Sequence, residues 1–237
     1  MAKGVEISVV IPAYNEEKYL GQTLEALNAQ TFKNFETIVV DGGSKDRTRA
    51  IAKRYGAKVI AQKSKTVGGA RNDGARVAKG DLIFFTNADT APSSGLLRLY
   101  HDLFRDKRIV AASGPLLPLE KTTLFIRFGY RFASVYLAKF AYLIGSPSMT
   151  GSNMAVRRSA FRKSGGFDTS LVTYEDLDLT LRLKKHGKVV FHDLAKVKTS
   201  TRRIVAWGVP RYIYFNAMNV AKYNFTRKAH GHYEVIR

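Results

Sequence analysis

Carboxylate side chains follow several apolar runs of this sequence, where they could serve as ligands. The clearest case is LIFFTNADTAP, in which an apolar run from Leu82 stops at Asn87, Ala88 and Asp89 before a Pro-Ser-Ser turn. Because ligands lie at the carboxyl ends of strands in open α/β sheets, Asp89 could hold a metal or a substrate. The other interpretation is that Asp89 only caps a helix that begins near Ser93.

A second group of carboxylates lies in the segment TYEDLDLTLRL. Glu175, Asp176 and Asp178 cluster at the start of an amphipathic helix. A carboxylate held beside an acceptor hydroxyl can act as a general base. Acidic residues near a helix N-terminus also interact favourably with the helix dipole, and this effect alone explains at least one of the three.

Three further polar segments flank apolar runs: PAYNE at 12–16, DGGSKD at 41–46 and GGARNDGA at 68–75. Each segment alone is consistent with an ordinary turn. In a parallel sheet, however, the carboxyl ends of the strands meet along one edge. We therefore expect these segments and the Asn-Ala-Asp triplet to converge on one cleft.

Alternating strands and helices must position these segments. The apolar runs predict strands at 7–11, 35–40, 58–61, from Leu82 onward and at 109–113. Helical spacing predicts helices at 16–30, up to Tyr55, up to Gly80 and at 93–104. This rhythm predicts an α/β fold with a mainly parallel sheet flanked by helices.

Two later segments are aromatic and basic. Residues 122–145 are predicted to form an amphipathic helix, on which Arg127 and Arg131 lie one turn apart and Lys139 adds a third charge. These charges argue against a membrane-spanning helix. The helix could lie at a membrane interface or pack on the core. A second aromatic segment at 207–225 favours the interface.

The net charge of +20 favours an anionic partner, such as nucleotide phosphates, lipid head groups or nucleic acid. No acidic residue lies between Glu120 and Asp168, or between Asp193 and Glu234. A basic surface that only maintains solubility is the alternative. Because the chain has no cysteine, any metal must be held by oxygen ligands or histidine. The N-terminus does not resemble a signal peptide, so we expect a cytoplasmic location.

The ordered set of motifs resembles the nucleotide-sugar-dependent glycosyltransferases of family 2, which have the GT-A fold. The resemblance covers residues 6–192, from SVVIPAYNEEKYLGQTLEAL through IVVDGGSKDRT, GGARNDGA and NAD to GSNMAVRRSAFRKSGGFD and TYEDLDLTLRL. It implies a GT-A catalytic domain at 1–200, with a nucleotide-binding half at 1–114 and an acceptor-side half at 115–200. A basic, aromatic helical extension follows at 201–237.

The resemblance also implies which residues bind the nucleotide of the donor. The loop after the first strand and the aspartate after the second would hold the base and the ribose, and the GGARNDGA segment would lie near the diphosphate. The expected nucleotide contacts are Pro12, Tyr14, Glu16, Asp41, Arg71, Asn72, Asn87 and Ala88.

A divalent metal, Mg²⁺ or Mn²⁺, is implied as the cofactor, because it neutralises the departing nucleoside diphosphate. The family's usual Asp-x-Asp triplet is Asn-Ala-Asp here. Asp89 is then the expected metal ligand, and Asn87 is a nucleotide contact. His192, which ends the run KVVFH, is a candidate second ligand, although a lone histidine there is more often structural.

On the acceptor side, the resemblance implies that Asp176, with Glu175 beside it, deprotonates the acceptor, so that a single displacement inverts the anomeric centre. Gly151, Ser152 and Asn153 match the segment that lines the acceptor. The segment STRRIVAW lacks the Gln-x-x-Arg-Trp pattern of processive members. Its Arg202 and Arg203 are expected to contact the diphosphate or an acceptor phosphate.

The sequence therefore predicts an inverting, metal-dependent glycosyltransferase that acts at the cytoplasmic membrane face. The partners are a nucleoside-diphosphate sugar and a lipid acceptor or a polyprenyl or dolichyl phosphate. One alternative is a basic nucleic-acid-binding protein, which explains the charge but not the ordered motifs; no nucleic acid is expected as a partner. Another is a degenerate relative that binds nucleotides without turnover, for which Asn87 is the only support.

Overall fold

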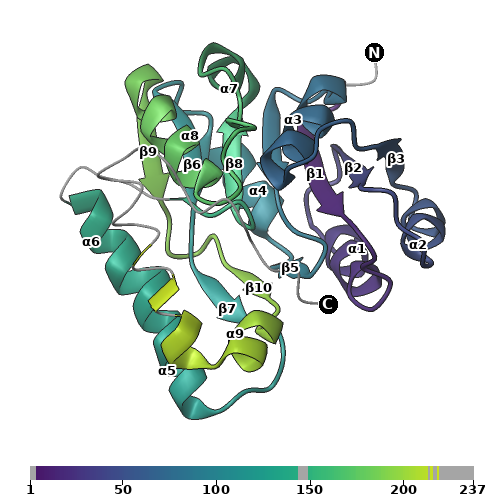
Figure 1. The fold of residues 1–237 in the computed structure, drawn as a ribbon. Coiled ribbons are helices and arrows are strands. Elements are labelled where there is room, and N and C mark those ends of the chain that lie inside the picture. Colours follow the sequence, from purple (N-terminus) through teal and green to yellow (C-terminus); the bar gives the residue numbers. More distant parts are fainter. Residues whose placement is uncertain (1–3, 144–148, 213, 216–217, 219–237) are drawn as a thin grey trace.

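A seven-stranded sheet forms the centre of the protein in a computed structural model, which describes residues 4–143, 149–212, 214–215 and 218 (Figure 1). The strand order is β3-β2-β1-β4-β8-β6-β9. Its strands are β1 (Ile7–Ala13), β2 (Phe35–Asp41), β3 (Lys58–Ala61), β4 (Leu82–Phe85), β6 (Ile109–Ser113), β8 (Met154–Arg157) and β9 (Lys188–Phe191). Every pair is parallel except those made by β8, which runs antiparallel to β4 and β6. The predicted α/β fold with a mainly parallel sheet is confirmed.

Helices cover both faces of this sheet (Figure 1). They are α1 (Leu20–Asn28), α2 (Thr48–Arg54), α3 (Val67–Val77), α4 (Leu96–Leu103), α7 (Arg158–Lys163), α8 (Glu175–Leu183) and the short 3₁₀ helix η2 (Lys184–His186). Residues of β4 alternate between two buried clusters: Phe84 packs with α1 and α4, and Phe85 packs with α3, α7 and α8. This two-sided burial explains the continuous apolar run of β4.

The helix predicted at 16–30 begins only at Leu20. Residues before it form a loop, in which Asn15 has a φ of 53°. Asparagine tolerates this left-handed conformation better than most residues, because its short polar side chain can bond locally. The loop leaves Glu16 outside the helix, at the carboxyl edge of β1.

A small second sheet has the order β5-β10-β7, with strands β5 (Thr90–Pro92), β10 (Val197–Thr199) and β7 (Leu116–Pro118). Strand β10 runs antiparallel to β5 and pairs Thr199 with Thr90. The pairing brings residues just after β10 next to the residue just before β5, Asp89. Helix α9 (Arg202–Trp207) begins there.

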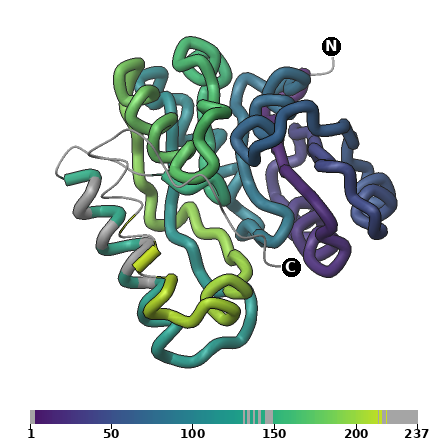
Figure 2. Tube along the Cα trace, in the orientation of Figure 1, coloured from purple at the N-terminus to yellow at the C-terminus, as the bar shows by residue number. Residues whose placement is uncertain are grey.

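The predicted helix at 122–145 is present as α5 (Leu124–Arg131), the π-helical segment η1 (Phe132–Leu137) and α6 (Ala138–Leu143). It runs along one side of the molecule beside α9 (Figures 1 and 2). Leu124, Phe125, Phe128 and Tyr136 are exposed on it. No helix in the described part of the chain is long and apolar enough to cross a membrane.

Most of the extension predicted at 201–237, including most of the aromatic segment at 207–225, lies outside the described residues, as do residues 144–145. Arg131 belongs to α5, but its side chain is not among those described. The predicted boundaries between the halves stay predictions.

Candidate active site

Glu16, Asp89 and Arg202 meet where the loop after β1, the end of the β4 loop and the start of α9 come together. Arg202 donates two hydrogen bonds to Glu16, from Nη2 to Oε1 at 2.6 Å and from Nη1 to Oε2 at 3.0 Å. Its Nη2 also lies 3.1 Å from Oδ2 of Asp89. We call these three residues the donor cluster, because the family resemblance implies that the nucleotide-sugar donor binds here.

Short-range contacts hold Arg202 in this position. The backbone N–H of Ser200 donates to the carbonyl of Asp89 at 3.1 Å. Glu120 accepts from the Ser200 hydroxyl at 2.6 Å and from the Thr201 N–H at 2.8 Å. The guanidinium lies over the ring of Tyr19, 4.9 Å from its centroid. The β5–β10 pairing and Glu120 therefore position Arg202.

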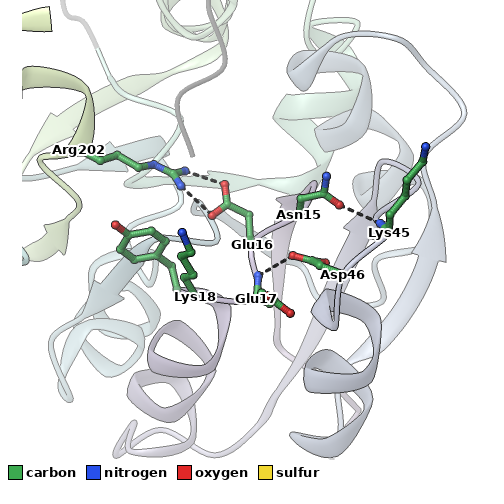
Figure 3. A pocket seen from close by; sticks show the side chains of 8 residues that line it. Asn15, Glu16, Glu17, Lys18, Lys45, Asp46 and Arg202 are labelled. Atoms are coloured by element: carbon green, nitrogen blue, oxygen red, sulfur yellow. Dashed lines mark hydrogen bonds and ion pairs between the residues drawn. The ribbon is translucent and has the colours of Figure 1, made fainter. Parts of the chain in front are cut away.

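A pocket of about 360 Å³ opens beside the donor cluster (Figure 3). Its lining combines acidic and basic side chains: Asn15, Glu16, Glu17, Lys18, Tyr19, Lys45, Asp46 and Arg202. The loops after β1 and β2 are joined here, because Lys45 donates its N–H to Asn15 at 2.8 Å and Glu17 donates its N–H to Asp46 at 3.1 Å. A pocket with this lining suits a charged, polar ligand.

The predicted nucleotide contacts in the first two loops lie at this edge. Tyr14 is 42% exposed at the end of β1. Pro12 lies in β1, beyond the last residue, Val10, that pairs with β4. Its missing N–H therefore removes no hydrogen bond to β4. Asp41 is buried and accepts from the N–H groups of Gly43 and Ser44 at 3.2 Å each, so it also shapes its own loop.

A second cluster of charges lies inside the protein. Arg71 of α3 donates to Oε1 of Glu175 at 2.7 Å and to Oδ1 of Asn87 at 3.1 Å. Arg71 and Glu175 are both buried, and Arg71 lies 5.4 Å from the centroid of the Phe167 ring. We call Arg71, Asn87 and Glu175 the buried cluster. It joins the triplet that contains Asp89 to the helix that contains Asp176.

Asp176 borders the buried cluster at the start of α8. Its Oδ2 accepts the N–H of Gly151 at 3.0 Å, and its Oδ1 accepts the N–H of Leu177 at 2.9 Å. A β-carbon at Gly151 would lie 2.3 Å from Cζ of Arg71, so a larger residue here would force the Arg71 guanidinium to shift. Tyr174, just before α8, has a φ of 64°, a left-handed conformation that is strained for a bulky residue. Such strained backbone is typical of functional sites.

Burial raises the pKa of Glu175 and Asp176 above the ordinary range of carboxyl groups. The nearby charge of Arg71 opposes this shift for both groups. Burial also raises the pKa of Asp89, and the charge of Arg202 opposes it. Carboxyl groups whose pKa values are shifted by burial and by a specific neighbouring charge are candidates for catalytic groups.

Several residues with predicted site roles also hold the fold. Asn72 donates to the carbonyl of Phe167 at 2.8 Å and accepts its N–H at 2.9 Å. Asn153 is fully buried, accepts from Tyr100 and donates to Gly114 and Ala195.

Asn153 therefore braces the two sheets, and its burial argues against a direct acceptor contact. Ser152 and Ala88, which also have predicted site roles, make backbone contacts. The Thr86 hydroxyl donates to the carbonyl of Ser152, and the Thr23 hydroxyl donates to the carbonyl of Ala88.

Two other predicted residues lie apart from the donor cluster. His192 follows β9, the edge strand, and its Nδ1 accepts the N–H of Leu194 at 3.2 Å. Strands β8 and β6 separate β9 from β4, which precedes Asp89. Arg203 lies over the ring of Trp207, 5.1 Å from its centroid. Neither residue contacts Asp89 among the interactions described.

The donor cluster fits a divalent metal that is held jointly with a diphosphate. No group of three or more histidine, aspartate or glutamate side chains suited to a metal occurs among the described residues. Mg²⁺ is commonly bound by one or two carboxylates together with substrate phosphates. Asp89 and Glu16 supply two such carboxylates, whereas the Asn87 oxygen accepts from Arg71.

Sequence reasoning missed Tyr19, Lys45, Asp46 and Glu120. The first three lie in or directly after the motif loops that the sequence singled out, so those loops could have indicated them. Glu120 had no local signal, because it reaches Ser200 across 80 positions.

Known proteins are similar to this chain in sequence and in fold. The family model "Glycosyl transferase family 2" matches residues 8–165. An uncharacterized glycosyltransferase of Rickettsia typhi is 28% identical over 200 residues, which are 81% of this chain and 63% of the relative. An O-antigen chain rhamnosyltransferase of Salmonella typhimurium is 30% identical over 210 residues, which are 83% of this chain and 67% of the relative. The chain thus spans less than two thirds of the Rickettsia relative.

Among solved structures, a mannosyltransferase from Pyrobaculum calidifontis in complex with GDP-Man and Mn²⁺ superposes with a TM-score of 0.70 at 18% identity. The match covers 97% of this chain and 67% of that chain. This similarity shows the shared GT-A fold. The matched residues and the fold together confirm the predicted resemblance: the chain belongs to glycosyltransferase family 2.

Proposed function

We propose that this chain transfers a sugar from a nucleoside-diphosphate sugar to an acceptor, with inversion of the anomeric centre. The observation that carries the proposal is the buried cluster, in which Arg71 contacts both Asn87 and Glu175. Through this contact the loop that ends in Asp89 lies beside the helix that presents Asp176. A donor held by the first and an acceptor held by the second would therefore meet.

The pocket beside the donor cluster receives the nucleotide in this proposal. Asn15 lines it, and Lys45 adds a positive charge. Tyr14 directly precedes Asn15, and Asp41 is the last residue of β2. Asp89 with Glu16 would hold Mg²⁺ or Mn²⁺, which neutralises the charge that develops on the departing diphosphate. The Pyrobaculum mannosyltransferase is in complex with GDP-Man and Mn²⁺, which supports a donor site that takes a nucleotide sugar together with a metal.

Asp176 acts as the general base in this proposal. Glu175 is engaged with Arg71 and is 6% exposed, so it positions the cluster. Asp176 is less buried and borders Gly151, in the segment matched to the acceptor side. It would take the proton of an acceptor hydroxyl while the hydroxyl oxygen attacks the anomeric carbon and the diphosphate leaves. If the acceptor is a phosphate, which needs no base, Asp176 would orient it.

The acceptor is a lipid or a polyprenyl phosphate at the cytoplasmic membrane face in this proposal. Leu124 is 80% exposed and Phe128 is 68% exposed on α5, and Val205 is 68% exposed on the neighbouring α9. Lys121 and Arg127 lie exposed among these apolar groups. Exposed aromatic and aliphatic groups with cations suit the interface of an anionic membrane.

A thermal-shift screen tests the donor site. Nucleoside diphosphates and their sugars are added with and without Mn²⁺ or Mg²⁺ to the wild type and to Asp89→Ala. We expect stabilisation that needs both nucleotide and metal and is lost in the variant. No nucleotide-dependent shift in the wild type would refute the proposal. Salt-sensitive binding of nucleic acid that survives Asp89→Ala would favour the nucleic-acid-binding alternative instead.

A further inference from the structure

Arg202 already neutralises the carboxylates to which the proposed function assigns a metal. One guanidinium nitrogen, Nη2, lies 2.6 Å from Glu16 and 3.1 Å from Asp89. The Arg202 side chain is only 20% exposed, and Tyr19 covers one of its faces. The donor cluster thus carries two negative charges and one positive charge, all supplied by the chain.

A second cation on Asp89 would lie close to this guanidinium. Two cations that share one carboxylate repel each other, and the repulsion is strong where water is partly excluded. A nucleoside diphosphate changes this balance, because its negative charges compensate the added cation. A guanidinium also matches phosphate oxygens in geometry and donates to them in pairs.

We propose that Arg202 is a resident counter-cation that competes with a divalent metal for Asp89, so that the metal binds tightly only together with a nucleoside diphosphate. The inference rests on the proposed function for the identity of this ligand. Arg202 releases Asp89 when metal and diphosphate enter and then donates to the phosphates. It couples the two ligands and disfavours binding of the metal alone.

Binding of Mn²⁺ tests the competition without any turnover. Mn²⁺ is titrated by electron paramagnetic resonance into the wild type, Arg202→Ala and Arg202→Gln, first alone and then with GDP or UDP. Lys198→Ala is the matched control, because it removes the same charge from an exposed position on β10. Thermal denaturation confirms that each variant is folded.

We expect Arg202→Ala and Arg202→Gln to bind Mn²⁺ alone about tenfold more tightly than the wild type, within the usual range of coupling between two ligands. Their gain in Mn²⁺ affinity from the nucleotide should be smaller by about the same factor. Lys198→Ala should behave like the wild type. Equal Mn²⁺ affinity in the Arg202 variants and the wild type, or no detectable Mn²⁺ binding by any of them, would overturn the inference.

Failure of the proposed function gives a different result. If the wild type shows no joint binding of Mn²⁺ with GDP or UDP, the donor assignment is wrong whatever the metal-only titration shows. If joint binding is present but the coupling is unchanged in both Arg202 variants, the donor assignment stands and the competition is wrong. The two titrations therefore separate the two claims.

Discussion

The donor cluster and the buried cluster use the same chemical groups in different ways. In each, an arginine joins carboxylate or amide oxygens from segments far apart in the sequence, and a non-glycine residue with positive φ, Asn15 or Tyr174, precedes the glutamate. Arg71 is 4% exposed, under Gly151 and Phe167, whereas the Arg202 side chain is 20% exposed at the edge of a pocket. An arginine–glutamate pair is thus a fixed brace in the buried cluster and an exchangeable contact in the donor cluster.

The largest effect is expected from Asp176→Asn, which keeps the shape of the site but removes the base. Sugar transfer to a hydroxyl acceptor should fall about 10³-fold, because general base catalysis typically contributes that much. Nucleotide binding, measured by calorimetry, should stay within a factor of about two because the donor cluster is untouched. Unchanged transfer to a hydroxyl acceptor would remove Asp176 from the chemistry.

The two arginines should differ in what they contribute to stability. Arg71→Met leaves Glu175 buried without its partner, which should lower the free energy of unfolding by about 3 kcal/mol. Arg202→Met should lower it by less, because the Arg202 side chain is 20% exposed whereas that of Arg71 is 5% exposed. Urea denaturation of both variants measures the difference. Equal losses in the free energy of unfolding would contradict the proposed difference between the two arginines.

The close packing of Gly151 on Arg71 sharpens the comparison. Gly151→Ala adds a methyl group within 2.3 Å of Cζ of Arg71, so the cluster must shift at a cost of about 1–3 kcal/mol. The matched control is Gly129→Ala in α5, where nothing lies within 4 Å of the added carbon. The control should gain about 0.5–1 kcal/mol from its better helix propensity. A Gly151→Ala protein as stable as the wild type would show that Arg71 moves freely.

The pH dependence should report the buried cluster. Because burial raises the pKa of Asp176, transfer to a hydroxyl acceptor should fall with decreasing pH at a midpoint above the usual aspartate range. The folded state binds this proton more tightly than the unfolded state, so the stability linked to Asp176 is present at low pH and is lost as pH rises through the raised pKa. The wild type should therefore lose stability relative to Asp176→Asn as the pH rises through the raised pKa, and a difference in stability that does not change with pH would contradict the pKa direction.

The smallest effect on folding is expected on the exposed helix. Phe128→Ser removes an aromatic group that is 68% exposed, so stability should change by less than about 0.5 kcal/mol. Binding to vesicles that contain anionic lipid, measured by sedimentation, should weaken severalfold if α5 lies at the membrane interface. Equal vesicle binding by the variant and the wild type would place the membrane contact elsewhere.

The sequence predicted the strands and loops that carry Glu16 and Asp89, but not the contact with Arg202 that joins them. Glu16 and Asp89 follow β1 and β4, which are long enough and apolar enough to be recognised, and the parallel rule brings their ends together. Arg202 reaches Glu16 across 186 positions, through the pairing of β5 with β10, and strands of three residues carry no recognisable sequence pattern. Asn72 and Asn153 have the residue types of ligands, but only the structure shows that they bond to the backbone and the core.

Release of nucleoside diphosphate from a panel of nucleotide sugars tests the central claim most directly. The wild type and Asp89→Asn are incubated with Mn²⁺ and with vesicles that contain polyprenyl phosphate. We predict that the wild type releases the diphosphate from at least one donor and transfers its sugar to the lipid, and that Asp89→Asn does so at least tenfold more slowly. Nucleotide binding without release or transfer from any donor would contradict the account and indicate a degenerate, nucleotide-binding relative.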